Sequence, residues 1–122
     1  MSAEENKAII RRLIEEVWSR GNTAVIDEVI ATDYVDHTPT TDIPGSEAFK
    51  QLVRGFRTAF PNLRITVEDM FAEGDKVVAR WKALGTHEGN FRGIAPTGNQ
   101  MTVTGTHVYR LTSGKLVERW GN

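Results

Sequence analysis

The sequence of 122 residues contains no cysteine, which excludes disulfides, thiolate metal sites and a cysteine nucleophile. It also lacks a strong excess of either charge. The 15 lysines and arginines and the 16 acidic residues give a net charge of −1. We therefore expect no nucleic-acid or membrane partner that depends on a basic surface. There is no apolar run of transmembrane length and no apolar segment typical of a secretion signal at the start. These absences predict a single cytoplasmic domain, residues 1–122.

Apolar residues recur at helical spacing through the first 60 residues. Ser2 and Glu5 have the spacing of a capping box, and the helix that they begin should end at Gly21. Two more amphipathic helices are expected over residues 24–31 and 47–60. The N-terminal half of the chain is therefore predicted to be helical.

From residue 63 onward the apolar residues alternate with polar ones, which is typical of half-buried strands. The strands are expected over residues 63–71, 77–84, 101–111 and 116–120. Three helices followed by four antiparallel strands predict an α+β fold with the helices on one face of a bent sheet.

The last two predicted strands form a hairpin whose turn has two interpretations. A two-residue turn at residues 113–114 places His107 opposite Trp120 and puts Glu118 on the pocket face. A three-residue turn with a glycine bulge instead places His107 opposite Arg119, with Glu118 and Trp120 on the other face. The sequence Leu-Thr-Ser-Gly-Lys, with glycine third in the loop, favours the three-residue turn.

Several segments in the right order resemble one known family. They are NKAIIRRLIEEVWSRGN, DYVDHTP, FRTAFPNLRITVEDMFAEGDKVVARW, GTHEGNFRGIAPTGNQMTVTGTHVYRL and GKLVERW. They look like the SnoaL-like polyketide cyclases and ester cyclases of the nuclear-transport-factor-2-like superfamily. The resemblance implies a cone-shaped, strongly curved, mostly antiparallel sheet that encloses a pocket with three N-terminal helices. It also implies homodimers or larger homo-oligomers formed through the sheet, and a short helical tail that these 122 residues would then lack.

The resemblance also implies where chemistry could take place. In cyclases of this family an aspartate near the end of the last strand is the acid/base of an aldol closure, and a histidine on the preceding strand binds or polarises the substrate. His107 matches the histidine, but the aspartate's position falls at Gly121, which cannot transfer a proton. Two functions therefore stay open. One is a cofactor-free acid/base enzyme acting on a small hydrophobic oxygenated molecule. The other is a ligand-binding or accessory domain without chemistry, which Gly121 favours.

His107 is the candidate catalytic residue, since an imidazole titrates near neutral pH and could polarise an oxygen or move a proton. The candidate substrate-binding residues are Tyr34, His37, Phe56, Phe60, Trp81, His87, Tyr109 and Arg119. The three histidines have no short spacing typical of zinc sites, so no metal is expected, and no cofactor is expected either.

An isomerase or dehydratase of the same superfamily would need a different acid, Asp69 or Asp36, and an epoxide hydrolase is a further alternative. Asp69 shares its parity along the strand with Leu63 and Phe71, and an inward carboxylate in an apolar wall would have a raised pKa. We favour the alternative that Asp69 faces solvent where the strand bends. Arg80 beside an acid is typical of some epoxide hydrolases, but no further motif of theirs is present.

Overall fold

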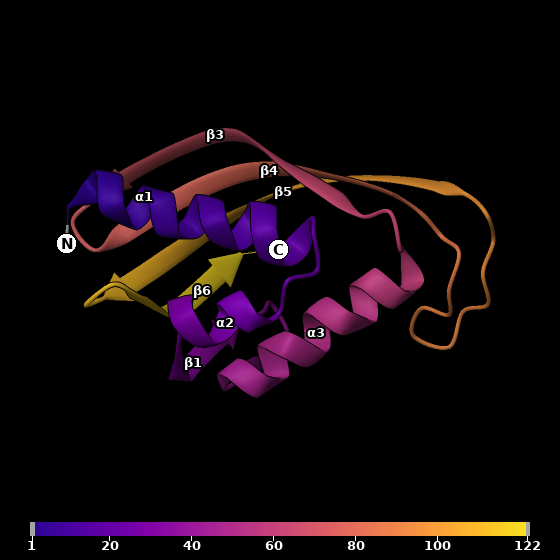
Figure 1. The fold of residues 1–122 in the computed structure, drawn as a ribbon, viewed down its shortest axis with the longest axis horizontal. Coiled ribbons are helices and arrows are strands. Elements are labelled where there is room, and N and C mark those ends of the chain that lie inside the picture. Colours follow the sequence, from indigo (N-terminus) through magenta and orange to yellow (C-terminus); the bar gives the residue numbers. More distant parts are fainter. Residues whose placement is uncertain (1, 122) are drawn as a thin grey trace.

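The computed structural model describes residues 2–121 and has the α+β architecture predicted from the sequence (Figure 1). Its helices are α1 (Ala3–Arg12), α2 (Ala24–Val29) and α3 (Ser46–Ala59). Its strands are β1 (Ile30–His37), β2 (Asp42–Pro44), β3 (Arg64–Glu73), β4 (Lys76–Thr86), β5 (Gln100–Thr112) and β6 (Lys115–Gly121). They form one mixed, mostly antiparallel sheet in the order β2-β1-β6-β5-β4-β3.

The first helix begins as predicted, with a complete capping box. The Glu5 N–H donates to Ser2 Oγ at 3.1 Å, and the Ser2 N–H donates to Glu5 Oε1 at 3.2 Å. After Arg12 the helix continues as a π-helical segment, Leu13–Trp18, whose apolar side chains are buried. The 3.6-residue spacing did not predict this wider turn.

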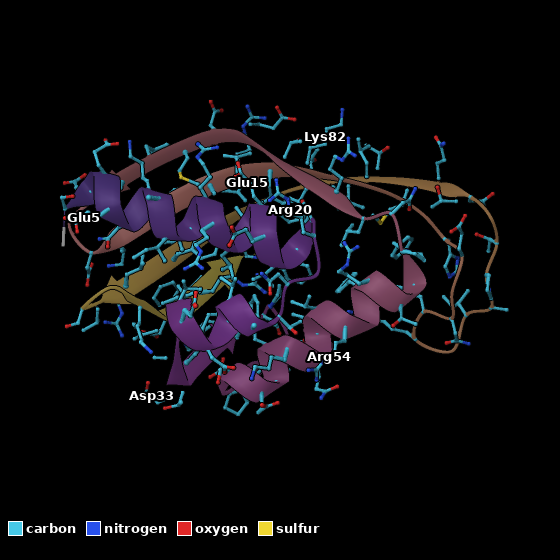
Figure 2. The ribbon with its side chains drawn as sticks, viewed as in Figure 1. Glu5, Glu15, Arg20, Asp33, Arg54 and Lys82 are labelled. Atoms are coloured by element: carbon cyan, nitrogen blue, oxygen red, sulfur yellow. The ribbon has the colours of Figure 1, made fainter. Side chains whose placement is uncertain are left out.

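Charged side chains of the helices lie on the outside of the molecule, where Figure 2 labels Glu5, Glu15 and Arg54, together with Arg20 in the turn that follows Trp18. Among residues 2–121, no helix combines the length and the apolar character needed to cross a membrane.

Two strands lie between α2 and α3, where no strand of the sheet was predicted from the sequence. The prediction that all strands follow all helices is therefore wrong. β1 pairs antiparallel with the short β2 and parallel with β6. The four predicted strands correspond to β3, β4, β5 and β6. A parallel partner more than 80 residues away leaves no local signal in the sequence, since the periodicity of a strand does not reveal its neighbour.

A β-bulge in β3 reverses which side chains of its second half face inward and which face outward. The register with β4 shifts between Val67 and Asp69, so one extra residue stands on β3 and the alternation reverses. Phe71, predicted to face inward, is instead 62% exposed, while Met70 packs against the core. Asp69 faces outward, as favoured, and its Oδ2 accepts two hydrogen bonds from Arg80, at 2.6 and 2.9 Å.

The hairpin between β5 and β6 has a two-residue turn, so the three-residue turn predicted from the sequence is wrong. Thr112 pairs with Lys115 and encloses Ser113 and Gly114, whose φ angles are +51° and +80°. Both values lie in the left-handed region, which identifies the type I′ turn that matches the twist of a hairpin.

The extra residue predicted for the turn is found in β6 instead, at Val117. Leu111 pairs with Leu116 and Arg110 with Glu118, so Val117 is left between the two pairs. His107 consequently lies opposite Gly121 rather than Arg119, which corrects the predicted pairing. Moving the extra residue from the turn into the strand leaves the side chains beyond it on the same faces. The prediction that Arg119 faces inward and Trp120 outward is therefore confirmed.

A long loop between β4 and β5 donates hydrogen bonds to a backbone carbonyl at the C-terminal end of α3. The backbone N–H groups of Glu88 and Gly89 both donate to the carbonyl of Ala59, at 2.9 and 3.1 Å. The last carbonyls of a helix lack partners within it, so this loop supplies them. Within the loop, His87 Nδ1 lies 3.1 Å from Thr97 Oγ1.

The outer face of the sheet carries a row of side chains in register across five strands. We call it the outer row: Phe71, Val78, Val108, Trp120 and His37. Each member lies directly opposite the next one on the neighbouring strand. Four of these five side chains are apolar, and His37 ends the row on the face that the helices leave uncovered.

Candidate functional site

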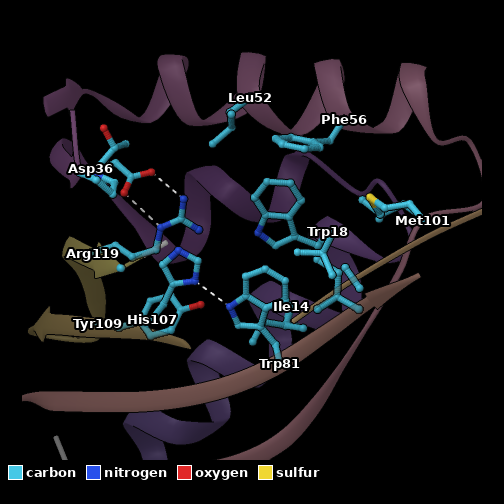
Figure 3. Close-up of a pocket in the computed structure, with 17 residues that line it drawn as sticks. Ile14, Trp18, Asp36, Leu52, Phe56, Trp81, Met101, His107, Tyr109 and Arg119 are labelled. Carbon is cyan, nitrogen blue, oxygen red and sulfur yellow. Dashed lines mark hydrogen bonds and ion pairs between the residues drawn. The ribbon is translucent and has the colours of Figure 1, made fainter. Parts of the chain in front are cut away.

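A cavity of about 290 Å³ lies between the helices and the inner face of the sheet (Figure 3). Most of its wall is apolar. The apolar lining consists of Ile14, Trp18, Pro39, Leu52, Phe56, Leu63, Ile65, Trp81, Ala83, Met101 and Val103. Apolar pockets with a few placed polar groups are typical of sites for small molecules.

Four ionisable side chains gather at one end of this cavity, which we call the polar end: Asp36, His107, Tyr109 and Arg119. Figure 3 shows them together on one side, with Phe56, Trp18 and Met101 toward the other. They come from β1, β5 and β6, the strands in the middle of the sheet. A bound molecule would therefore have a polar and an apolar end.

Asp36 and Arg119 form a buried ion pair at the polar end. The two residues lie side by side on the parallel strands β1 and β6. Arg119 donates from Nη2 to Oδ2 of Asp36 at 2.5 Å and from Nε to Oδ1 at 3.2 Å. Only 4% of Asp36 and 6% of Arg119 are exposed. Such a bidentate pair holds both groups in one orientation.

The Arg119 guanidinium lies over the ring of Phe49. Its central carbon lies 5.2 Å from the centre of the Phe49 ring, which contacts the Tyr34 ring edge to face at 5.6 Å. Burial raises the pKa of both phenols, Tyr34 and Tyr109. Both therefore stay protonated at neutral pH. Arg119 thus remains charged beside neutral groups and one carboxylate.

His107 lies between Arg119 and Trp81 (Figure 3). The Trp81 indole N–H donates to His107 Nδ1 at 2.7 Å, and the two rings lie edge to edge and nearly coplanar, with centroids 5.6 Å apart and 13° between their planes. Burial, reinforced by the positive charge of Arg119, lowers the pKa of His107 to about 3. The imidazole is therefore uncharged at neutral pH.

Gly121, opposite His107, has a backbone conformation that excludes other residues. Its φ is +137°, and an added Cβ would lie 2.3 Å from the Thr106 carbonyl oxygen and 2.9 Å from His107 Cδ2. Position 121 faces the cavity, as predicted, but in this conformation it has no room for a side chain.

The structure brings together some of the residues singled out in the sequence. Five of them line the cavity: Phe56, Trp81, His107, Tyr109 and Arg119. Tyr34 is buried behind the polar end, against Phe49. Phe60, at the end of α3, packs against His87 in the loop that follows β4, with ring centroids 5.4 Å apart. Neither is part of the cavity lining.

His37 lies on the outer face of the sheet and not in the cavity lining. Its Nδ1 lies 2.9 Å from Asp42 Oδ1 and its Nε2 lies 2.8 Å from Glu118 Oε2, while its ring stacks on Trp120. Hydrogen bonds to Glu118 and Asp42 raise the pKa of His37. Successive residues of a strand face opposite sides of the sheet. Because Asp36 faces the cavity, His37 faces the outer side.

Sequence reasoning named Asp36 as an alternative acid but did not include it among the candidate substrate-binding residues. The alternation of β1 contained the signal, because Tyr34 and Asp36 share one face of that strand. The parallel pairing with β6, which brings Arg119 beside Asp36, was not visible.

The described residues, 2–121, contain no group of three or more histidine, aspartate or glutamate side chains arranged to hold a metal ion.

Comparison with known proteins agrees with this geometry. The model of the SnoaL-like polyketide cyclase family matches residues 8–122. The chain belongs to this family. It is 30% identical to AclR, a proposed hydroxylase from Streptomyces galilaeus, over 99% of this chain and 76% of AclR, with a TM-score of 0.89.

Two further proteins have similar structures. A proposed polyketide cyclase from Acidithiobacillus ferrooxidans is 31% identical, with 100% of this chain and 90% of the other covered and a TM-score of 0.85. IdmH, a proposed polyketide cyclase from Streptomyces antibioticus, is 31% identical, with 96% and 90% covered and a TM-score of 0.81. No curated protein matches the chain.

Proposed function

We propose that the protein binds a small, mostly hydrophobic molecule whose oxygen atom lies at the polar end of the cavity, and that it acts on this molecule by cofactor-free acid/base chemistry. The cavity, with its apolar walls and its ionisable groups at one end, is the observation that carries this proposal. In the cone-shaped fold that the family resemblance implies, this cavity would be the interior of the cone.

Each group at the polar end has a role in this proposal. Arg119, His107 and Tyr109 would donate hydrogen bonds to a carbonyl or enolate oxygen, which stabilises negative charge that develops there. Asp36 is the only carboxylate in the described lining of the cavity and would accept the proton. The apolar wall would orient the carbon skeleton.

A ligand-binding or accessory role without catalysis is the alternative, and Gly121 favours it. The proton-transferring aspartate of the family cyclases would occupy this position, and the backbone of Gly121 has no room for a side chain. Asp36 is moreover already engaged by Arg119.

Binding can be tested with two molecules of nearly equal shape, 2-acetonaphthone and 2-ethylnaphthalene, only the first of which carries a carbonyl oxygen. Trp18 and Trp81 line the cavity, so their fluorescence reports occupancy. We expect the ketone to bind roughly tenfold more tightly, because a hydrogen bond to a charged donor contributes about 1.5–3 kcal/mol.

The variant His107→Leu should reduce this preference, because it removes one neutral donor and leaves Arg119, whereas His37→Gln, on the outer face, should leave it unchanged. Equal affinity for both molecules in the wild type would contradict the role of the polar end. If neither molecule nor any larger aromatic ketone binds, the proposed function is wrong.

Catalysis is tested separately, by deuterium incorporation from D₂O into the methyl group of 2-acetonaphthone. Exchange above the buffer rate that is lost in Asp36→Asn would support proton transfer by Asp36. Binding of the ketone without any exchange would favour the non-catalytic alternative.

We further propose that two copies associate through the outer row, as the family resemblance implies. Phe71 is 62% exposed on this face, and both charge signs flank the row, as in the pairs of Arg80 with Asp69 and Arg110 with Glu118. Light scattering should give twice the chain mass of 13.6 kDa at micromolar concentration.

Phe71→Glu should shift this association toward monomers, because a carboxylate placed in an apolar contact is costly to bury. Arg54→Glu on the exposed side of α3 is the control and should not change the mass. A wild-type protein that stays at 13.6 kDa at all accessible concentrations would contradict this assembly.

A further inference from the structure

We propose that Trp81 is a positioning residue that locks His107 in the tautomer protonated at Nε2, so that His107 donates a hydrogen bond to a ligand oxygen and does not act as a base. The second half of this inference rests on the proposed function. The first half, the fixed tautomer, does not depend on any ligand.

The hydrogen bond between the two rings decides the tautomer. An indole N–H can only donate, so His107 Nδ1, 2.7 Å from Trp81 Nε1, must accept and carries no proton. In a neutral imidazole the proton is then on Nε2. Nδ1 is already occupied and Nε2 is already protonated. No lone pair of the ring is therefore left to take a proton from a substrate.

The sheet holds the two rings in this relation. Trp81 on β4 lies opposite Gly105 on β5, and His107 is two residues further along β5, which makes the two side chains diagonal neighbours on the inner face. Gly105 has no side chain that would fill the space between them. The planes of the two rings differ by only 13°, and this nearly coplanar arrangement suits a hydrogen bond between the edge of the indole and the in-plane lone pair of Nδ1.

The charged and titratable groups around His107 favour its neutral form. Arg119 on β6 carries a positive charge beside it, and the pKa of Tyr109 on β5 is raised by burial, so that phenol is neutral. Asp36 on β1, the one carboxylate of the polar end, is bound by Arg119 at two atoms. A second proton on His107 would therefore meet a buried cation, and burial itself opposes the charge.

The locked tautomer restricts what can bind at the polar end. His107 Nε2–H and the guanidinium of Arg119 are both donors, so neither can satisfy the other. An oxygen with free lone pairs, such as a carbonyl or enolate oxygen, would satisfy both. An ammonium group would find two donors and a positive charge, so the site should reject amines of the same shape.

The experiment measures the tautomer directly in the protein without ligand. Long-range ¹H–¹⁵N spectra of protein labelled in histidine distinguish protonated from unprotonated ring nitrogens, and His107→Gln assigns the signals. We expect His107 to show a proton on Nε2 only, unchanged between about pH 5 and 8, where an ordinary histidine titrates.

Trp81→Phe keeps an aromatic ring but removes the N–H. In this variant the single tautomer should be lost, with Nδ1 protonated in part of the molecules. Trp18→Phe removes an indole N–H from the same cavity without touching this hydrogen bond, and it should leave the His107 signals as in the wild type. Circular dichroism shows that each variant is folded before it is compared.

The wild-type spectrum alone can overturn the inference, whether or not Trp81→Phe folds. A proton on Nδ1, or a titration near the ordinary histidine pKa of 6.5, would show that the lock does not exist. A His107 signal unchanged in folded Trp81→Phe would show that Trp81 is not the cause. A confirmed lock with no ketone binding would separate this inference from the proposed function, which would then be wrong by itself.

Discussion

Replacing Arg119 with methionine should lower the free energy of unfolding by about 3–5 kcal/mol, because it leaves Asp36 as a buried carboxylate without a partner. Both residues are more than nine-tenths buried, and the carboxylate receives its two strong hydrogen bonds from this one guanidinium. Methionine fills most of the volume of the arginine stem. The loss of unfolding free energy therefore comes from the unpaired carboxylate rather than from a cavity. Urea denaturation followed by circular dichroism measures the effect.

The exposed pair on β3 and β4 provides a matched control. Arg80 also donates two hydrogen bonds to one aspartate, Asp69, but both side chains are more than half exposed. Arg80→Met should therefore cost less than about 1 kcal/mol, the usual limit for a solvated ion pair. Equal losses of unfolding free energy in the two methionine variants would contradict the argument that burial makes loss of the Asp36 partner more costly.

The double variant Asp36→Leu with Arg119→Met separates stability from function. Replacing both charges by apolar groups should recover most of the stability lost in Arg119→Met, since no buried charge is left unpaired. It should still abolish the preference for the ketone, because the strongest donor of the polar end is gone. A double variant as unstable as the single one would contradict this account of the pair.

Replacing Gly89 with alanine should lower the free energy of unfolding by about 2–3 kcal/mol. A Cβ built on Gly89 would lie 2.1 Å from the carbonyl oxygen of Thr58, a backbone atom that cannot rotate away. The loop would have to separate from α3, and the Ala59 carbonyl would lose the two N–H groups that complete the end of the helix. Denaturation with urea gives the change.

Gly55, in the middle of α3, is the matched control because a Cβ there meets nothing within 4 Å. Gly55→Ala should stabilise the protein by about 0.5–1 kcal/mol, since alanine restricts the unfolded chain and suits a helix. The two alanine substitutions should therefore act in opposite directions. A neutral Gly89→Ala would show that the loop is not held against α3 through this contact.

The sequence predicted the architecture well where its signals are local. The capping box at Ser2 and Glu5, the inward parity of Trp81, His107 and Tyr109, and the α+β class all follow from spacing between near neighbours. Each of these features depends on a period or a motif within one element, which is what a single sequence records.

Bulges and distant pairing caused the errors. The extra residue in β3 reversed the orientation of Phe71, and the extra residue in β6 appeared at Val117 rather than in the turn. Both bulges are adjustments of one strand to its neighbour, so neither is encoded in the alternation of one strand. The pair of Asp36 and Arg119 joins positions 83 residues apart, and the sequence alone did not reveal this contact.

The conformation of Gly121 also limits how this protein can change over generations. A carboxylate at this position would need a Cβ where the Thr106 carbonyl oxygen now lies, together with a φ angle that side-chain-bearing residues rarely adopt. The end of β6 would have to move before an aspartate side chain could fit. The acid that the family resemblance implies at this position would therefore need further changes in the surrounding backbone. Selection for proton transfer would act more readily on Asp36, which is already in the cavity.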